Sequence, residues 1–347
     1  MQIAKGRRAI SKRATIVDIA REAGVSIKTV SRVLNEEPHV KAAVRTRVKE
    51  VAKELNYHPN VNAQGLIARR NYLIGLTYER PSPSYVVELQ RGALERLAGE
   101  RYRLMVLPFG NATDNTDGLV ALLRAAAVDG VVLAPPSCDL MPVLDALDNV
   151  GIAYARIAPT VETGRGVCAA MDDVCAAREI AEHVIGLGHR RFAVILGDPT
   201  HAASRARLEG YRQAFVAAGL DFPGVRLERG DFTFESGNAA AQRILRGGKR
   251  PTAILAQNDD MAVGALMAAR DLGLSVPEDL SITGFDDSEV SRLSWPRVTT
   301  IRQPVFEMAV DATDGLLNLL AGNHGAPMKV HRHALLVRQS TAPPPHP

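Results

Sequence analysis

The side chains best suited to recognise another molecule lie near the N-terminus, in a short stretch with helical periodicity. Residues 27–34 place their apolar side chains on one face. The opposite face carries Lys28, Thr29, Ser31 and Arg32. Ammonium and guanidinium groups can donate to base edges, and hydroxyl groups can reach phosphates. This face therefore has the chemistry of a nucleic-acid contact.

Other groups of reactive side chains do not form a consistent catalytic or metal-binding pattern. Adjacent carboxylates occur at Asp172–Asp173, Asp259–Asp260 and Asp286–Asp287. Neighbouring residues of a strand point to opposite faces, so such pairs do not converge on one ligand. His331 and His333 would share a face in an extended segment, but a third metal ligand is not apparent. No GxGxxG motif follows a strand, and neither a phosphate-binding GxxxxGK motif nor a GxSxG elbow occurs, so we expect no enzyme, metal or cofactor.

Two short helices joined by a tight turn would position the basic face. Thr15 and Ser26 each precede an amphipathic run and can cap the N-terminus of a helix. The break between the runs is Gly24-Val25-Ser26, and a third helix is predicted over residues 42–55. Two helices around a glycine-containing turn are typical of a helix-turn-helix, whose second helix can enter the DNA major groove. An ordinary helical hairpin is the alternative.

Positive charge is concentrated in the same region. Residues 1–70 contain 15 lysines and arginines against 6 aspartates and glutamates, a net charge of +9, whereas the chain of 347 residues has a net charge of +4. The remaining residues are therefore slightly acidic, with a net charge of −5. A basic head on a near-neutral body predicts binding to a polyanion through phosphate neutralisation. Residues 1–14 form a basic arm, for which a solvated surface is the alternative.

From Leu73 onward, strand patterns alternate with helical patterns. Strands are expected at residues 73–77, 104–107, 130–134, 153–157, 167–171, 192–196, 253–256, 281–285 and 334–337. Helices are expected at residues 85–98, 117–127, 174–187, 204–218, 236–246, 259–272 and 306–320. This alternation predicts parallel sheets covered on both faces, and about 270 residues are better divided between two lobes than placed in one sheet. The proline-rich residues 342–347 are expected to be disordered.

Cysteine usage and hydropathy indicate the compartment. The three cysteines form no CxxC pair, which favours reduced thiols. No apolar run of about 20 residues exists, and no apolar segment of a secretion signal follows the basic N-terminus. We therefore expect a cytoplasmic protein that does not bind membranes.

Several short motifs occur in order along the chain. They are the helix-turn-helix pattern at residues 15–35, Asn56-Tyr57 with Pro59-Asn60, and the segments 187–193, 258–262, 284–287 and 299–301. Together they are similar to the LacI/GalR (lactose-repressor/galactose-repressor) family of bacterial transcriptional regulators, from about Thr15 to Thr341. The resemblance implies a small all-α helix-turn-helix head plus an α/β core of two doubly wound lobes, like that of periplasmic sugar-binding proteins.

The resemblance also divides the chain into functional segments. They are a basic arm (1–14), a helix-turn-helix domain (15–59), a hinge helix (60–70), an effector-binding and dimerisation core (71–341) and a tail (342–347). The N-terminal lobe would combine about 71–170 with 302–330, and the C-terminal lobe 171–299 with 332–341. The chain would cross between the lobes near residues 170–173, 298–302 and 330–333.

DNA contacts are implied for the head and the hinge. By resemblance, Ile27, Lys28 and Arg32 address base edges. The positions matched to phosphate contacts are Thr15, Ser26, Thr29, Ser31, Asn35 and His39. Leu66 matches a hinge leucine that wedges into the minor groove, with an ordinary linker leucine as the alternative, and Ala63 would pack two hinge helices together. Gly65 weakens this helix, so we expect the hinge to fold only on DNA.

A small-molecule effector is implied for the cleft between the lobes. The matched positions are Tyr78, Tyr85, Asp172, Arg207, Phe232, Asn258 and Asp286, with Asp173 as the alternative to Asp172. Carboxylate, amide and guanidinium groups suit vicinal hydroxyls, and an aromatic face can cover the C–H surface of a sugar. A sugar or glycoside is therefore the expected effector, with a purine or another metabolite as the alternative. Asp286 and Asn258 could instead cap helices, and Phe232 and Tyr85 could belong to the core.

The resemblance further implies a homodimer that reads a palindromic operator and is controlled by the effector. Val263 and Leu266, on the predicted helix 259–272, would lie at the dimer interface. Because no heptad pattern follows Arg338, we expect a dimer rather than a tetramer. A periplasmic solute-binding protein is the other alternative, but the basic head argues against it.

Overall fold

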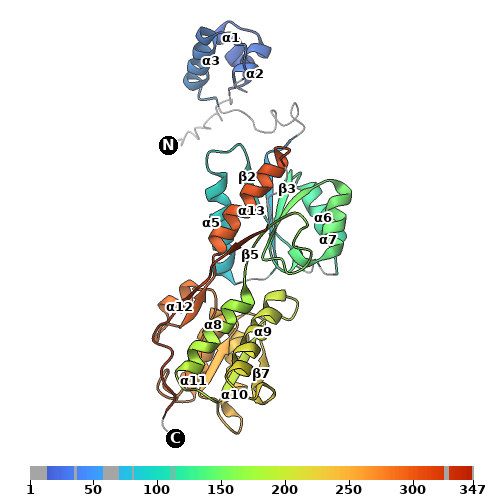
Figure 1. The fold of residues 1–347 in the computed structure, drawn as a ribbon. Coiled ribbons are helices and arrows are strands. Elements are labelled where there is room, and N and C mark those ends of the chain that lie inside the picture. The colour runs from blue at the N-terminus through green and yellow to red at the C-terminus, as the bar shows by residue number, and fades with distance from the viewer. Residues whose placement is uncertain are drawn as a thin grey trace, which may run out of the picture. The chain divides into compact units, whose positions relative to one another are not determined.

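The computed structural model describes residues 14–34, 37–57, 70–79, 82–110, 112, 114–323 and 328–345. The chain forms two compact units, residues 1–71 and 72–347 (Figure 1). The predicted basic arm, except its last residue, and most of the predicted hinge lie outside the described residues. The same is true of Asn35, Ala63 and Leu66. In the part of the chain that is described, no helix is long and apolar enough to cross a membrane.

The first unit is a head of three helices with a core of its own. These are α1 (Ile16–Ala23), α2 (Ile27–Leu34) and α3 (Ala42–Glu54). Ile19, Val30, Val33 and Val48 are fully buried between them. The helices are therefore held together by one apolar stripe from each, as their periodicity predicts.

The turn between α1 and α2 follows from local backbone chemistry. Thr15 and Asp18 form a reciprocal capping box at the start of α1. Gly24 ends α1 in the left-handed conformation, with φ of 68°, which glycine adopts without steric cost. Ser26 Oγ then accepts the backbone N–H of Thr29 at 3.1 Å at the start of α2. The predicted helix-turn-helix is confirmed.

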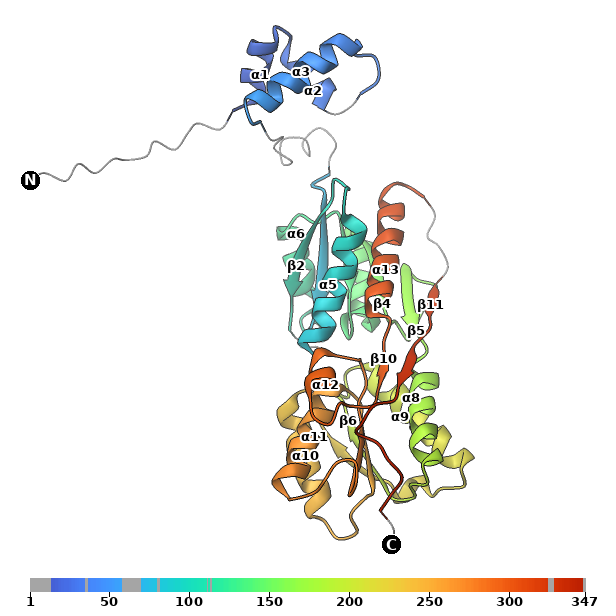
Figure 2. The same cartoon turned by 90° about the vertical axis from the view of Figure 1, so that its left-hand side faces the viewer.

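The N-terminal lobe of the second unit is built on a parallel sheet of six strands in the order β11-β5-β4-β3-β1-β2. The strands are β1 (Leu73–Tyr78), β2 (Arg103–Pro108), β3 (Gly130–Leu133), β4 (Ala153–Ile157), β5 (Val167–Met171) and β11 (Lys329–His331). The helices are α5 (Pro83–Leu97), α6 (Thr116–Ala125), α7 (Met141–Val150) and α13 (Val305–Leu320), and a 3-10 turn η1 spans Ser137–Asp139. α5 packs with α13 on one face of the sheet, and α6 packs with α7 on the other (Figures 1 and 2).

The C-terminal lobe repeats this plan on a parallel sheet in the order β7-β6-β8-β9. Its strands are β6 (Phe192–Leu196), β7 (Arg226–Arg229), β8 (Ala253–Ala256) and β9 (Ser281–Thr283). Its helices are α8 (Asp173–Gly186), α9 (Ala202–Ala217), α10 (Phe234–Arg246), α11 (Asp259–Asp271) and α12 (Glu289–Leu293), with a 3-10 turn η2 at Phe222–Gly224. The pairs α8–α9 and α10–α11 pack closely and cover opposite faces. The predicted class, a helical head with two doubly wound lobes, is confirmed.

Three segments of chain cross between the lobes. The first follows β5, the second contains β10 (Thr300–Arg302), and the third joins β11 to β12 (Ala334–Leu336). β10 and β12 pair as an antiparallel two-stranded sheet, so the second and third crossings are hydrogen-bonded to each other (Figure 2).

Some elements of the core differ from the sequence prediction. α7, β7, α12, β10 and β11 were not predicted. The strand β7 has a single apolar residue at a sheet edge, and β10 is only three residues long, so neither carries a clear periodicity. The strand predicted at residues 281–285 ends at Thr283.

Ala342 corrects the prediction that residues 342–347 are disordered. Its carbonyl accepts hydrogen bonds from His189 Nε2 at 2.8 Å and from Ser281 Oγ at 3.0 Å. Its N–H donates to Ser281 Oγ at 3.1 Å. The chain is therefore attached to the C-terminal lobe as far as this residue, while residues 346 and 347 lie outside the described part.

Candidate functional site

The outward face of α2 exposes the side chains that the sequence assigns to base recognition. Ile27, at the first position of the helix, is 49% exposed although it is apolar. Lys28 and Arg32 are exposed on the same helix. Arg32 Nε lies 3.5 Å from Glu37 Oε2 in an exposed ion pair that solvent screens, so this pair contributes little to holding the guanidinium in place.

The hydroxyl groups matched to phosphate contacts also hold the helix N-termini. Thr15 Oγ1 donates to Asp18 Oδ2 at 2.7 Å, and Ser26 Oγ lies 2.9 Å from Thr29 Oγ1. The first N–H groups of a helix and its dipole attract phosphate, so both N-termini are suited to anchor a DNA backbone. Of the other three positions, Asn35 lies outside the described residues, Ser31 is half-buried and His39 is exposed with φ of 75°.

A cavity of about 210 Å³ lies between the two lobes of the second unit. Because the strands of both sheets are parallel, their carboxyl ends meet near the same region, and helices begin there. Ser82 caps α5 by accepting the N–H of Tyr85, and Asn258 caps α11 by accepting the N–H of Met261 at 2.9 Å. Both of these capping residues line the cavity.

Arg207 is the central charge of the cavity. It lies in α9 and is only 4% exposed. Its Nε donates to Asp173 Oδ1 at 2.9 Å, and its Nη1 donates to the carbonyl of Gln257 and lies 3.9 Å from Asp286 Oδ1. The guanidinium carbon sits 3.7 Å from the centroid of the Phe285 ring, a cation–π contact. Burial alone would lower the pKa of Arg207, but Asp173 and Asp286 raise it above its usual value, so the charge is retained.

Asp286 occupies a strained turn after β9. Its φ is 123°, a conformation that residues with a side chain rarely adopt, and such strain often occurs at ligand sites. Its N–H donates to the carbonyl of Ile301 at 2.8 Å, and its Oδ1 accepts from Gln303 Nε2. Burial raises the pKa of this carboxyl well above its usual value, and Arg207 opposes the shift.

An aromatic wall closes the C-terminal side of the cavity. Phe232 has φ of 70°, and its carbonyl accepts from Asn258 Nδ2 at 2.9 Å. A Cβ on Gly197 would lie only 2.1 Å from Phe232 Cζ, so only glycine lets the ring take this position. His201 packs against Phe232 edge to face, with ring centroids 5.4 Å apart. Burial lowers the pKa of His201, which favours a neutral imidazole able to donate and accept.

The N-terminal lobe contributes Tyr85 and a loop after β4. Tyr85 lines the cavity, and burial is the main cause that raises its pKa. Thr160 and Val161, on the loop that joins β4 to β5, also line the cavity. In the C-terminal lobe, Asn258 caps α11 and also lines the cavity, so its expected role as an effector residue and the alternative role as a helix cap are compatible.

Two of the expected effector residues are not in the cavity lining. Tyr78 ends β1 and packs against the core of the lobe. Asp172 is the N-cap of α8, where its Oδ1 accepts the N–H of Cys175 at 2.8 Å. Its neighbour Asp173 faces the cavity and pairs with Arg207, so the alternative that the sequence left open is the one that fits the structure.

Sequence reasoning missed several cavity residues. His201 and Gln303 line the cavity, as do Thr160 and Val161. His201 stands at the beginning of the helix that follows β6, and this place after a strand was an available signal. Gln303 follows β10, which the sequence did not reveal as a strand.

The residues expected at a dimer interface differ in exposure. Leu266 is only 8% exposed and belongs to the core of the C-terminal lobe, whereas Val263 is half-buried. The exposed apolar residue on α11 is Met267. Leu266 is thus packed within its own lobe, and its assignment to a dimer interface stays a prediction.

Comparison with known proteins matches both units of the chain. Residues 15–60 match the model described as bacterial regulatory proteins, lacI family, and residues 181–341 match the periplasmic binding protein-like domain. The HTH-type transcriptional regulator DegA of Bacillus subtilis (strain 168) is 34% identical over 334 residues, which cover 95% of this chain and 98% of DegA. The regulator CelR of Thermobifida fusca is 32% identical, covering 95% of this chain and 98% of CelR.

Solved structures of lacI-family regulators are also similar to this chain. The lac repressor dimer bound to operator and the anti-inducer ONPF has a TM-score of 0.83 and 27% identity, covering 95% of this chain and all of that chain. A complex of the transcriptional regulator CelR with cellobiose has a TM-score of 0.71 and 30% identity, covering 94% of this chain and all of that chain.

Proposed function

Because the chain belongs to the lacI family of bacterial regulatory proteins, we propose that it is a cytoplasmic repressor that binds a palindromic operator as a homodimer and responds to a sugar. The family consists of DNA-binding transcriptional regulators, not enzymes. The observation that carries the proposal is that one chain combines a head exposing a basic recognition helix with a cavity built around the buried Arg207.

The head supports sequence-specific DNA binding. Lys28 and Arg32 can donate to guanine acceptors, while Ile27 can only contact an apolar group such as a thymine methyl. Phosphate contacts from the helix N-termini would fix the orientation without selecting a sequence. In our proposal the operator half-site therefore has a guanine contacted by Lys28 next to a thymine contacted by Ile27.

The chemistry of the cavity supports a compact ligand with several hydroxyl groups. Arg207 and Asp286 place a donor and an acceptor side by side, and neutral His201 can serve as either. Phe232 supplies an apolar ring face beside these polar groups. The volume lies below the range of roughly 300–1,000 Å³ usual for drug-sized ligands, which favours a small sugar. CelR, a relative solved with the disaccharide cellobiose, supports a sugar ligand but does not bear on its size.

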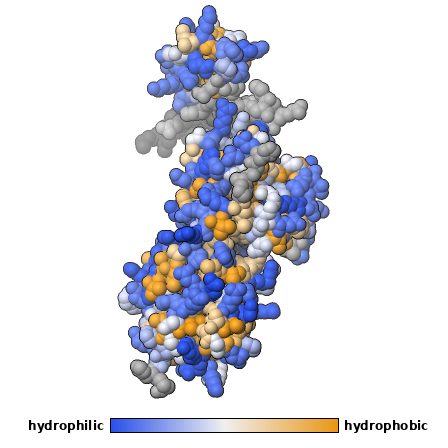
Figure 3. Space-filling view, in the orientation of Figure 1, coloured by the Kyte–Doolittle hydropathy of each residue, from blue (hydrophilic) through white to orange (hydrophobic). Residues whose placement is uncertain are grey.

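Exposed apolar side chains on the C-terminal lobe support the dimer. Leu293, the last residue of α12, is 76% exposed, and Trp295, two residues later, is 85% exposed. Met267 is exposed on α11. Figure 3 shows hydrophobic residues gathered on the visible face of this lobe. In the proposed dimer, Val263 and Met267 of α11 face the partner, while Leu266 stays in the core. Two-fold symmetry of such a dimer matches a palindromic operator.

Selection of duplexes from a random library, followed by fluorescence anisotropy, tests DNA binding by the full chain. We expect a palindromic consensus whose affinity falls steeply with salt. No preference over random duplex at low salt would refute the proposal. Thermal unfolding in the presence of ribose, galactose, cellobiose and purine bases then tests the effector. A ligand at 100 times its Kd stabilises by about 2.7 kcal/mol, which is readily detected. Stabilisation by a purine alone would replace the sugar with that ligand class.

A further inference from the structure

A buried arginine occupies the middle of the N-terminal lobe. Arg156 lies in β4, flanked by the buried residues Ala155 and Ile157, and its side chain is fully buried. Taking a guanidinium out of water is costly, and a well-packed apolar side chain at such a position is often as stable or more stable. The position of Arg156 therefore suggests a role beyond packing, and its hydrogen bonds show where that role lies.

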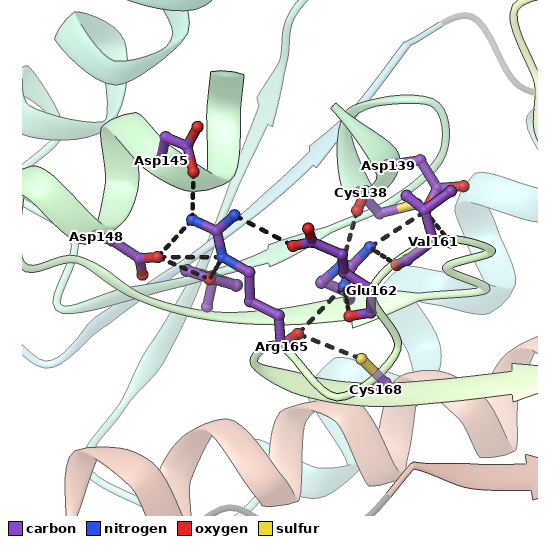
Figure 4. A network of polar contacts seen from close by, with 10 residues as sticks. Cys138, Asp139, Asp145, Asp148, Val161, Glu162, Arg165 and Cys168 are labelled. Atoms are coloured by element: carbon purple, nitrogen blue, oxygen red, sulfur yellow. Dashed lines mark hydrogen bonds and ion pairs between the residues drawn. The ribbon is translucent and has the colours of Figure 1, made fainter. Parts of the chain in front are cut away.

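The guanidinium of Arg156 binds two segments that form one wall of the cavity. Nε donates to the carbonyl of Cys138 in η1 at 2.7 Å, and Nη2 donates to Asp139 Oδ1 at 3.2 Å (Figure 4). The other bonds go to residues 158–166, the loop between β4 and β5, which we call the lip loop. Its acceptors there are the carbonyls of Val161 at 2.7 Å, Glu162 at 2.8 Å and Arg165 at 3.2 Å.

The lip loop has a conformation that needs such support. Ala158 has φ of 49° and Glu162 has φ of 43°, both in the left-handed region that residues with a Cβ disfavour. Strained residues of this kind persist only where surrounding contacts fix them. Arg156, in strand β4, supplies such contacts by donating hydrogen bonds to three carbonyls of the loop. Arg156 is thus one of the side chains that fix the shape of the loop.

Asp139 transmits this arrangement to the cavity surface. Its carboxylate accepts the N–H of Thr160 at 2.9 Å and the hydroxyl of Thr160 at 2.7 Å. It also accepts the N–H of Val161 at 3.4 Å. Because the Thr160 hydroxyl donates to Asp139, its lone pairs remain to accept a hydrogen bond from a ligand. Asp139 itself is occupied by these bonds and by Arg156.

We propose that Arg156 is a positioning residue for effector binding, which acts through Asp139 to hold Thr160 and Val161 in place as the N-terminal wall of the cavity. The identity of the effector rests on the proposed function, whereas the geometry of the wall does not. A ligand hydroxyl that donates to Thr160 would be recognised only when the lip loop is held in this shape. Arg156 thereby reduces the ordering cost that the ligand would otherwise meet on binding.

Four variants of the full-length protein separate this role from simple stabilisation. Arg156→Met removes the buried guanidinium. Asp139→Asn keeps the shape of the side chain but removes its charge and replaces one of its two acceptor oxygens by a donor, so the charge-assisted bonds to Thr160 are weakened. Thr160→Val removes only the hydroxyl. The matched control is Arg165→Met. Arg165 lies on the same loop, but its guanidinium pairs with Asp145 and Asp148 of α7 and, at 3.4 Å, with Glu162, and none of these residues lines the cavity (Figure 4).

Two measurements are needed for each variant. The first is the Kd of whichever of cellobiose, ribose or galactose binds the parent protein. We expect it to rise about tenfold or more in Arg156→Met and Asp139→Asn, and by a smaller factor in Thr160→Val, with operator affinity in the absence of sugar unchanged. Arg165→Met should keep the parent Kd. If the Kd rose equally in Arg165→Met and Arg156→Met, Arg156 would act only by stabilising the loop in general, and the proposal would be wrong.

The second measurement is hydrogen exchange of a peptide that contains Thr160 and Val161. It requires no ligand, so it remains decisive if no sugar binds and the proposed effector class fails. Exchange should accelerate in Asp139→Asn and Arg156→Met but not in Thr160→Val, where the backbone N–H bonds to Asp139 remain. Parent-like exchange in Asp139→Asn would refute the positioning role even if Arg156→Met did not fold.

Discussion

Replacing Arg207 by methionine should separate effector sensing from DNA binding. The guanidinium is buried, charged and bonded to Asp173, so the variant removes the central donor of the cavity while keeping much of the volume. The head is a separate compact unit with its own core, and none of its residues lines the cavity within the described part. Operator affinity in the absence of effector should therefore remain at the parent value.

The magnitude follows from what the ion pair leaves behind. Removing one partner of a buried pair costs about 3–5 kcal/mol of stability, because Asp173 keeps an uncompensated charge. Losing one charge-assisted hydrogen bond to a ligand costs about 1.5–3 kcal/mol, or roughly ten- to 150-fold in effector affinity. The variant should be less stable by thermal unfolding and should lose the effector response in operator anisotropy.

A double variant distinguishes a ligand contact from a merely structural one. Adding Asp173→Asn to Arg207→Met removes the orphan charge and should restore a large part of the lost stability. Effector affinity should stay low, because the donor is still missing. If the double variant regained the parent effector response, Arg207 would act only by neutralising Asp173, and the assignment of Arg207 to the ligand would be wrong.

Three further predictions concern the head, the aromatic wall and pH. Lys28→Met should weaken the preferred operator by about 1–3 kcal/mol and relax the base preference at one position, whereas Lys249→Met on the C-terminal lobe should leave anisotropy titrations unchanged. Gly197→Ala should displace Phe232 and weaken effector binding in calorimetry, with operator affinity as the parent-like control. Burial raises the pKa of Asp259 to about 6 from 3.8, so the folded state holds this proton more tightly than the unfolded state. The contribution of Asp259 to the free energy of unfolding should therefore fall by on the order of 3 kcal/mol as the pH rises from about 4 to about 6. Urea unfolding of Asp259→Asn, measured over the same pH range, should not show this fall.

The head could be predicted almost completely because its signals are local. Gly24 marks the left-handed end of α1, and Thr15 and Ser26 stand where helix caps are needed. The periodicity of the apolar residues fixes which side of α2 faces out. Each of these properties depends on residues within one turn of each other, so the sequence contains it directly.

The cavity could be predicted only in part because its geometry depends on distant segments. A one-residue difference at the start of α8 decides that Asp172 caps the helix and Asp173 meets Arg207. In the sequence Arg156 is only a charge inside an apolar strand, and its partners in η1 and the lip loop become visible in three dimensions alone. Leu266 has helical spacing that fits either a core or an interface, and tertiary packing places it in the core.

The contacts around Asp286 indicate how a ligand could influence the movement of the lobes. The backbone N–H of Asp286 donates to the carbonyl of Ile301 in β10. The side-chain amide of Gln303, which follows β10 on the same crossing, donates to the carboxylate of Asp286. β10 is paired with β12, so a ligand held by Asp286 acts on two crossings at once. The first crossing, at Asp172, is not part of this two-stranded sheet.

A ligand can change the equilibrium between an open and a closed arrangement of the lobes only if it binds one of them more tightly than the other. Arg207 and Asp286 belong to the C-terminal lobe, whereas Tyr85 and Thr160 belong to the N-terminal lobe, so a ligand that contacts both sets favours the closed arrangement. One charge-assisted hydrogen bond made only on closure supplies about 1.5–3 kcal/mol, which is already within the 1–3 kcal/mol typical of allosteric coupling. A ligand that contacts only the C-terminal set would bind without a response. Loss of Arg156 should weaken both effector binding and the response, because Thr160 is then no longer held against the ligand while Tyr85 remains.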